Sequence, residues 1–124
     1  MVKLAGVSSF TWKTTEQVYP FEKASDGSTL YCKEVNCGTL PNNGQQEVAH
    51  NITFSPFSNT KLHSLTGRIT ATTDPGWTGV IPYTHPGAGF TLLNIVTATN
   101  ITFISGAPLG SYGWQAVARL IYAK

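Results

Sequence analysis

Alternation of apolar and polar side chains is clearest in the segment from Leu62 to Thr72. Successive side chains of a β-strand point to opposite faces, so alternation with a period of two indicates a half-buried strand. The mostly apolar side carries His63, Leu65, Gly67, Ile69 and Ala71, and the polar side carries Ser64, Thr66, Arg68, Thr70 and Thr72. The segment is therefore predicted to be one strand whose apolar side faces a core.

The final segment, Trp114 to Lys124, is also predicted to be a strand, but both of its sides carry apolar residues. One side carries Trp114, Ala116, Ala118, Leu120 and Tyr122, and the other carries Gln115, Val117, Arg119, Ile121 and Ala123. A strand with one solvated face is polar on that side, so Val117 and Ile121 predict that a second sheet or another chain covers it. Val117, Arg119 and Ile121 are therefore candidate residues of an oligomer interface.

Further segments are predicted to be strands because they are rich in apolar and β-branched residues and are bounded by turn residues such as Asp26-Gly27. These segments are Leu30 to Gly38, Gln45 to Ile52 (an edge strand), Trp77 to Tyr83, Phe90 to Val96 and Asn100 to Ile104. Seven or eight short strands in all are typical of a β-sandwich or a jelly roll. The predicted fold class is therefore all-β with antiparallel strands.

The composition agrees with a single all-β domain. Thr, Gly, Pro and Asn are frequent, and these residues favour strands and turns, whereas long helical patterns are absent. A chain of 124 residues has the length of one domain. Residues 1–15 show no clear period and are predicted to be an N-terminal arm, followed by the β-sandwich domain at residues 16–124. Phe10 and Trp12 are the candidate anchors with which the arm docks onto a partner.

Sparse charge argues against several classes of function. Asp, Glu, Lys and Arg make up 11% of the chain, against about 25% in typical globular proteins, and the formal net charge is +2. Nucleic-acid binding needs clustered Lys and Arg, which this sequence lacks. The chain has neither an apolar run near the roughly 18 residues of a membrane span nor the apolar stretch of a signal peptide. We therefore expect no nucleic-acid partner, no membrane insertion and synthesis in the cytoplasm.

Cys32 and Cys37 lie five positions apart in one predicted strand. The odd offset places them on opposite faces, about 16 Å apart in an extended chain. A disulfide needs Cα atoms within about 7 Å, so both are predicted to be free and to pack as small hydrophobic residues.

The titratable residues show no pattern that indicates catalysis. His50, His63 and His85 lack the short paired spacing of a zinc site. Asp26 and Asp74 both fall in predicted turns, where Asp-Gly and Asp-Pro account for them. A nucleophile elbow and a Gly-rich phosphate loop are both missing. The sequence therefore predicts no enzymatic activity, no metal and no cofactor.

Aromatic residues near predicted loops are the remaining candidates for ligand binding. They are Trp77, Tyr83 with His85, and Tyr112 with Trp114. Aromatic faces stack on sugar rings and anchor protein interfaces, although each of these residues also fits a role in the core or at a loop base. Tyr112 is the first choice, because Gly110-Ser111-Tyr112-Gly113 offers it little to pack against.

Short segments in a particular order along the chain carry a family resemblance. They are Glu16-Gln17-Val18, Asp26-Gly27, Leu30-Tyr31-Cys32-Lys33-Glu34-Val35, Gly38-Thr39-Leu40-Pro41-Asn42, Val48-Ala49-His50-Asn51-Ile52, Gly67 to Ala71, Ile81-Pro82-Tyr83, Asn100-Ile101 and Tyr122-Ala123-Lys124. In this order and spacing they resemble the C-terminal domain of tail fibre and minor structural proteins of tailed bacteriophages, over residues 16–124. The resemblance implies a β-sandwich, commonly trimeric, that is displayed on the virion and binds rather than catalyses. It transfers no receptor-binding residues.

The leading hypothesis is a bacteriophage virion protein, a homotrimeric tail-fibre or spike tip domain that binds a host-surface glycan beside other virion proteins. Family domains usually end a much longer chain, whereas here only a short arm from Met1 precedes the domain, so we expect either an excised fragment or a free-standing small virion protein. A capsid decoration or head-fibre protein that docks through the arm is therefore the alternative, and a small cellular lectin is the second alternative. Because charge is sparse, we expect loop aromatics and short polar side chains to contact the ligand, with little dependence on salt.

Overall fold

The structure is a computed structural model. It describes residues 10–54, 56–71, 78–80, 83–85, 90–108 and 113–124. The strands formed by these residues are β1 (Gln17–Lys23), β2 (Thr29–Thr39), β3 (Asn42–Ala49), β4 (Leu62–Ala71), β5 (Thr78–Val80), β6 (Tyr83–His85), β7 (Phe90–Val96), β8 (Asn100–Pro108) and β9 (Trp114–Tyr122). The only helical element in the described part of the chain is one short 3-10 turn at Asn59–Lys61. The predicted all-β class is confirmed.

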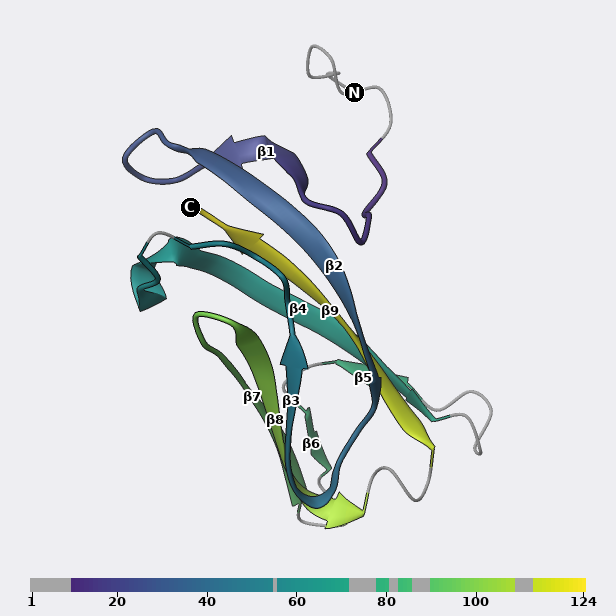
Figure 1. The fold of residues 1–124 in the computed structure, drawn as a ribbon. Coiled ribbons are helices and arrows are strands. Elements are labelled where there is room, and N and C mark those ends of the chain that lie inside the picture. Colours follow the sequence, from purple (N-terminus) through teal and green to yellow (C-terminus); the bar gives the residue numbers. More distant parts are fainter. Residues whose placement is uncertain (1–9, 55, 72–77, 81–82, 86–89, 109–112) are drawn as a thin grey trace.

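The strands form two antiparallel sheets (Figure 1). Within the described residues, one sheet has the order β1-β2-β9-β4-β5 and the other has the order β3-β8-β7-β6. Strands far apart in the sequence are neighbours, because β9 pairs with both β2 and β4, and β8 pairs with both β3 and β7. This arrangement confirms the predicted sandwich.

The hydrophobic core lies between the two sheets. The five-stranded sheet contributes residues such as Ile69 and Leu120, and the four-stranded sheet contributes Ile101 and Phe103. The buried members of the core are Val35, Cys37, Leu40, Ile52, Ile69, Ala71, Ile101, Phe103, Trp114, Ala116, Ala118, Leu120 and Tyr122. We call the side of the five-stranded sheet that faces this core the inner face, and the opposite side the outer face.

Strand β9 has the alternation predicted for it. Its inner residues from Trp114 to Tyr122 are all buried, whereas the residues between them are half-buried or exposed. The outer residues are Gln115, Val117, Arg119 and Ile121. The predicted strands over Leu30 to Gly38 and Phe90 to Val96 are likewise confirmed as β2 and β7.

A β-bulge corrects the faces predicted for β4. Leu62 pairs with Tyr122, and Ser64 pairs with the next residue, Ile121, so the register shifts between them. His63 is the extra residue at this shift, and it is exposed and pairs with Glu22 instead of facing the core. A bulge inserts one residue into the alternation, so Leu62 and Leu65 both lie on the inner face, although an uninterrupted period of two would place them on opposite faces.

The prediction of one strand from Trp77 to Tyr83 is wrong. Thr78–Val80 forms β5 beside β4, whereas Tyr83–His85 forms β6 at an edge of the other sheet. The chain therefore changes sheets within a segment that reads as continuous, and His85, predicted to lie in a loop, belongs to a strand. Both strands have three residues, too few for their period to reveal the break.

A second buried region lies on the outer face and is separate from the core. Leu30 is 1% exposed and Cys32 is 0% exposed, yet neither belongs to the core between the sheets. Cys32 pairs with Ile121 of β9 and Gln17 of β1, which places it on the outer face. β1 and the segment before it lie at the end of the five-stranded sheet away from the other sheet (Figure 1). The chain itself therefore covers this part of the outer face.

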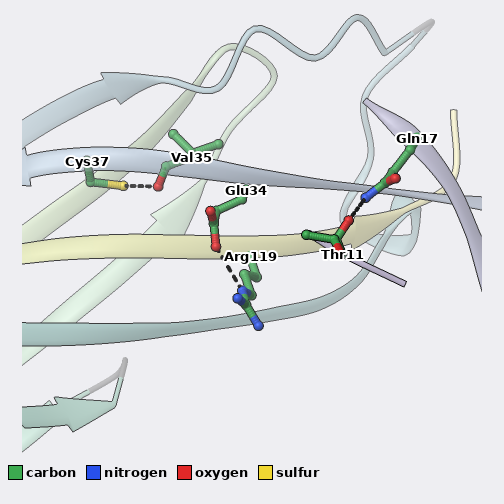
Figure 2. A network of polar contacts seen from close by, with 6 residues as sticks. All are labelled: Thr11, Gln17, Glu34, Val35, Cys37 and Arg119. Atoms are coloured by element: carbon green, nitrogen blue, oxygen red, sulfur yellow. Dashed lines mark hydrogen bonds and ion pairs between the residues drawn. The ribbon is translucent and has the colours of Figure 1, made fainter. Parts of the chain in front are cut away.

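The two cysteines lie on opposite faces, as their spacing predicted. Val35 pairs with the inner residue Ala118, and Cys37 belongs to the core with it, whereas Cys32 is an outer residue. Both thiols are free. The Cys37 thiol donates a hydrogen bond to the Val35 carbonyl at 3.5 Å, and its burial raises its pKa to about 11 (Figure 2).

Candidate functional site

The part of the outer face around Val117 and Arg119 of β9 is the candidate functional site. Three central strands form it, with β9 between β2 and β4. Register places Glu34, Arg119 and Thr66 in one row across these strands. Asn36, Val117 and Arg68 form the next row. Because residues paired across strands share a face, the long side chains of both rows surround the shorter Val117.

These two rows form a shallow hollow. Its volume is about 210 Å³, and its lining residues are Glu34, Thr66, Gly67, Arg68, Val117 and Arg119. It is smaller than the roughly 300–1,000 Å³ of pockets that hold drug-sized molecules. The hollow therefore suits a single small group, such as one sugar unit, rather than a large ligand.

Arg119 is held by two neighbours, Glu34 and Trp12, and Figure 2 shows its contact with Glu34. Its Nε donates a hydrogen bond of 3.0 Å to Oε1 of Glu34, and its Cζ lies 5.1 Å from the centre of the Trp12 ring. A carboxylate in contact with one edge and an aromatic ring beside the guanidinium plane together restrict the side chain. Arg119 nevertheless remains 46% exposed, so its terminal N–H groups are accessible.

Arg68 lies diagonally across from Arg119, one row along on β4. Its side chain is exposed, and it has no ion pair or hydrogen bond with the described residues. Diagonal neighbours on adjacent strands have Cα atoms roughly 7–8 Å apart, which long side chains can span. The two guanidinium groups can therefore reach one ligand in the hollow.

An aromatic cluster lies next to the hollow. Phe10 contacts Trp12, Tyr19 and Phe21 in edge-to-face geometry, with ring centres 5.2–6.1 Å apart. Tyr19 and Phe21 are on β1, and Phe21 is 47% exposed. Phe10 and Trp12, the predicted docking anchors of the arm, thus pack against the chain's own sheet, and docking onto a partner stays a prediction. A backbone hydrogen bond of 2.8 Å from Glu34 N–H to the Lys13 carbonyl, and a side-chain hydrogen bond of 2.9 Å from Gln17 Nε2 to the Thr11 carbonyl, hold this segment in place.

The other charged cluster lies where the end of β9 meets the start of β1. The Tyr122 hydroxyl donates a 2.5 Å hydrogen bond to Glu16, and the Lys124 ammonium lies 2.5 Å from the same carboxylate. Burial raises the pKa of Glu16, but these two partners outweigh it and leave that pKa below its ordinary value. Burial, and then the Glu16 hydrogen bond, raise the pKa of Tyr122. This cluster joins two ends of the domain and has a structural role.

The predicted loop aromatics are only partly placed. Tyr83 and His85 lie on β6, an edge strand, where they pair with Leu92 and Phe90 of β7. Their side chains lie outside the described part of the structure, as do Trp77 and Tyr112 altogether. The ligand-binding role of these four residues stays a prediction.

The candidate interface residues separate into two groups. Val117 and Arg119 line the open hollow, whereas Ile121 is half-buried beside Cys32. The apolar outer side of the terminal strand predicted that another sheet or chain covers it, and β1 and the arm of the same chain supply part of this cover. The role of Val117, Arg119 and Ile121 in an oligomer stays a prediction.

Several residues of the family resemblance stabilise turns of the fold. The buried His50 bridges the end of β3 and the turn before β8, because its Nε2 lies 2.9 Å from the Thr97 carbonyl and its Nδ1 accepts a 3.0 Å hydrogen bond from Ile52 N–H. The buried Leu40 follows Gly38, whose φ of 67° lies in the left-handed region that favours glycine. These residues therefore have a structural role, and the family resemblance stays a prediction.

Sequence reasoning missed Glu34 and Arg68 as site residues. Each reads as an ordinary polar position on the solvated side of a strand, and only pairing through β9 brings them together. The one available signal was Arg119, a charged residue between the apolar Val117 and Ile121.

Two further observations concern the described residues alone. They contain no group of three His, Cys, Asp or Glu side chains placed to hold a metal ion. None of their helices is long and apolar enough to cross a membrane.

No family model, curated protein or solved structure matches this chain.

Proposed function

We propose that this chain is a binding module of a bacteriophage virion, the host-contacting tip domain of a tail fibre or similar spike. The ordered segments over residues 16–124 that resemble tail fibre domains support the virion assignment, and the sandwich fold agrees with it. Binding is favoured over catalysis because the described site contains arginine, aromatic and threonine side chains without a nucleophile and base in contact.

One observation carries the binding role. On the outer face, a hollow lined by Glu34, Arg68 and Arg119 is open, and Trp12 of the neighbouring aromatic cluster lies over Arg119. Aromatic side chains beside directed polar groups are the usual components of sugar and protein recognition sites. A tail-fibre tip would present this face to the host surface, which is the proposed partner.

Oligomerisation belongs to the same proposal. A shallow site binds one ligand weakly, and linking several copies raises avidity by roughly 10²–10⁴ without new contacts. Light scattering after size exclusion should give a mass near three times 13.3 kDa. A monomer at high micromolar concentration would contradict the trimer and leave binding to be tested separately.

The test of function is adsorption of the purified protein to candidate host cells. Fluorescently labelled protein should bind a susceptible host saturably, and excess unlabelled protein should displace it. Absence of saturable binding to every candidate host would contradict the proposal, and incorporation into capsids without cell binding would favour the decoration protein. In the same assay, Tyr112→Ala with unchanged circular dichroism tests the loop prediction, which requires weaker binding than wild type.

A further inference from the structure

The hollow on the outer face concentrates positive charge in a chain with little of it. Arg68 and Arg119 contribute two positive charges and Glu34 one negative charge, so the hollow carries +1 of a formal net charge of +2 for the whole chain. The guanidinium group binds carboxylate and phosphate through paired N–H donors, which makes two neighbouring arginines a natural anion site.

The two arginines differ in how they are held. The Nε of Arg119 is bonded to Glu34 and its guanidinium lies against Trp12, so its terminal N–H groups are already oriented before a ligand arrives. Arg68 has no ion-pair partner in the described part of the chain and lies beside Val117, diagonally across from Arg119. An anion between them would meet one fixed donor group and one adjustable group, and it would relieve the repulsion between two like charges.

The geometry points to a binding site for a carboxylate-bearing sugar, such as a hexuronic acid unit of a host-surface polysaccharide. The carboxylate lies between Arg68 and Arg119, the apolar face of the ring lies over Val117, and Thr66 offers a hydroxyl to the ring's own hydroxyl groups. The volume of about 210 Å³ holds one sugar unit. A net charge of +1 is too small for phosphate-rich nucleic acid, whose binding scales with the number of phosphates neutralised.

This inference deepens the proposed function. The claim that the sugar comes from a host surface rests on the proposed function, whereas the binding site itself does not. Binding itself is measured without cells, by titrating isotope-labelled protein with tri-galacturonic acid and following backbone amide shifts by NMR. Amides from Thr66 to Arg68 and from Val117 to Arg119 should shift saturably. The methyl-esterified trimer, which lacks the charge, should cause much smaller shifts.

The matched variants are Arg68→Gln and Lys23→Gln, which remove the same charge inside and outside the hollow. Both residues are exposed, so the fold should be unchanged. Because hydrogen bonds to charged groups are strong, Arg68→Gln should weaken binding about tenfold or more, whereas Lys23→Gln should change it less than twofold. Equal losses in the two variants would mean that net charge alone attracts the ligand and would overturn the site.

Two further outcomes separate the ligand class from the function. Equal binding of inorganic phosphate at the same amides would reduce the site to a general anion site and overturn the sugar assignment. Binding of the acidic trimer without adsorption to any host would refute the proposed function and leave the site intact. Host adsorption that Arg68→Gln leaves unchanged would overturn the host surface as the source of the sugar and leave the proposed function intact.

Discussion

The inner and outer faces of strand β9 are buried by different parts of the chain. On the inner face, alternate side chains from Trp114 to Tyr122 are 0–6% exposed, and core residues of the second sheet such as Ile101 and Phe103 pack in the same cluster. On the outer face, Cys32 beside Ile121 is fully buried and Trp12 lies over Arg119, whereas Val117 lines an open hollow. The second sheet therefore buries the inner residues of β9, whereas the short N-terminal segment leaves room for a site on the outer face.

The largest difference between the two faces should appear in a matched pair of substitutions on β9. Leu120→Ala removes a fully buried inner side chain and should lower the free energy of unfolding by about 2–5 kcal/mol. Ile121→Ala removes a half-buried outer side chain and should lower it by about 1 kcal/mol. Urea denaturation of both variants measures the contrast, and equal losses would show that the outer cover is as tightly packed as the core.

Deleting residues 1–15 should remove part of the outer cover and leave the core intact. We expect a cooperative transition, a loss of about 1–2 kcal/mol from the aromatic contacts of Phe10 and Trp12, and a Cys32 thiol that reacts with Ellman's reagent. Cys37 should stay protected because it lies between the sheets.

Trp12→Ala in the full chain serves as the control for this deletion, since it removes one ring without shortening the chain. Loss of the cooperative transition on deletion would show that the arm belongs to the core. An unreactive Cys32 in the deleted chain would show that β1 alone covers the outer face.

A smaller and pH-dependent effect should come from the Glu16 cluster. The pKa of Glu16 in the folded protein lies below its ordinary value, so this carboxylate stabilises the fold above its unfolded pKa, and the contribution is lost as pH falls through the folded pKa. Glu16→Gln should therefore be less stable than wild type at neutral pH, with the difference vanishing well below the ordinary carboxyl pKa of about 4.3. Glu47→Gln, at an exposed position on β3, is the control. A difference that persists in acid would mean that the hydrogen bond from Tyr122, rather than charge, stabilises the cluster.

A thiol reductant is expected to have no effect on thermal stability. Cys32 and Cys37 are both free and lie on opposite faces of the five-stranded sheet, and burial raises the pKa of each thiol. The midpoint of thermal melting should be the same with and without a thiol reductant. A lower midpoint under reducing conditions would require a disulfide and a different register for β2.

Local pattern predicted the long strands β4 and β9. The apolar side of Leu62 to Thr72 and the alternation of Trp114 to Tyr122 were both recognisable, because period two is a property of neighbouring residues alone. The bulge at His63 and the change of sheet between Val80 and Tyr83 were not recognisable, because both depend on which strand lies alongside. For the same reason the sequence predicted an apolar second side of β9 without showing that β1 covers part of it.

By itself, the sequence determined the all-β class, the core-facing residues of β9 and, apart from His63, those of β4, and the separation of Cys32 from Cys37. Tertiary structure decided that β9 lies between β2 and β4, and with that pairing it placed Glu34 beside Arg119 and Arg68 diagonally across from it. A scattered composition of 11% charged residues therefore contains a local cluster that the average conceals. The physical reason is that register between distant strands is set by the packing of the whole inner face, and a shift of one residue would turn every one of these side chains to the other side.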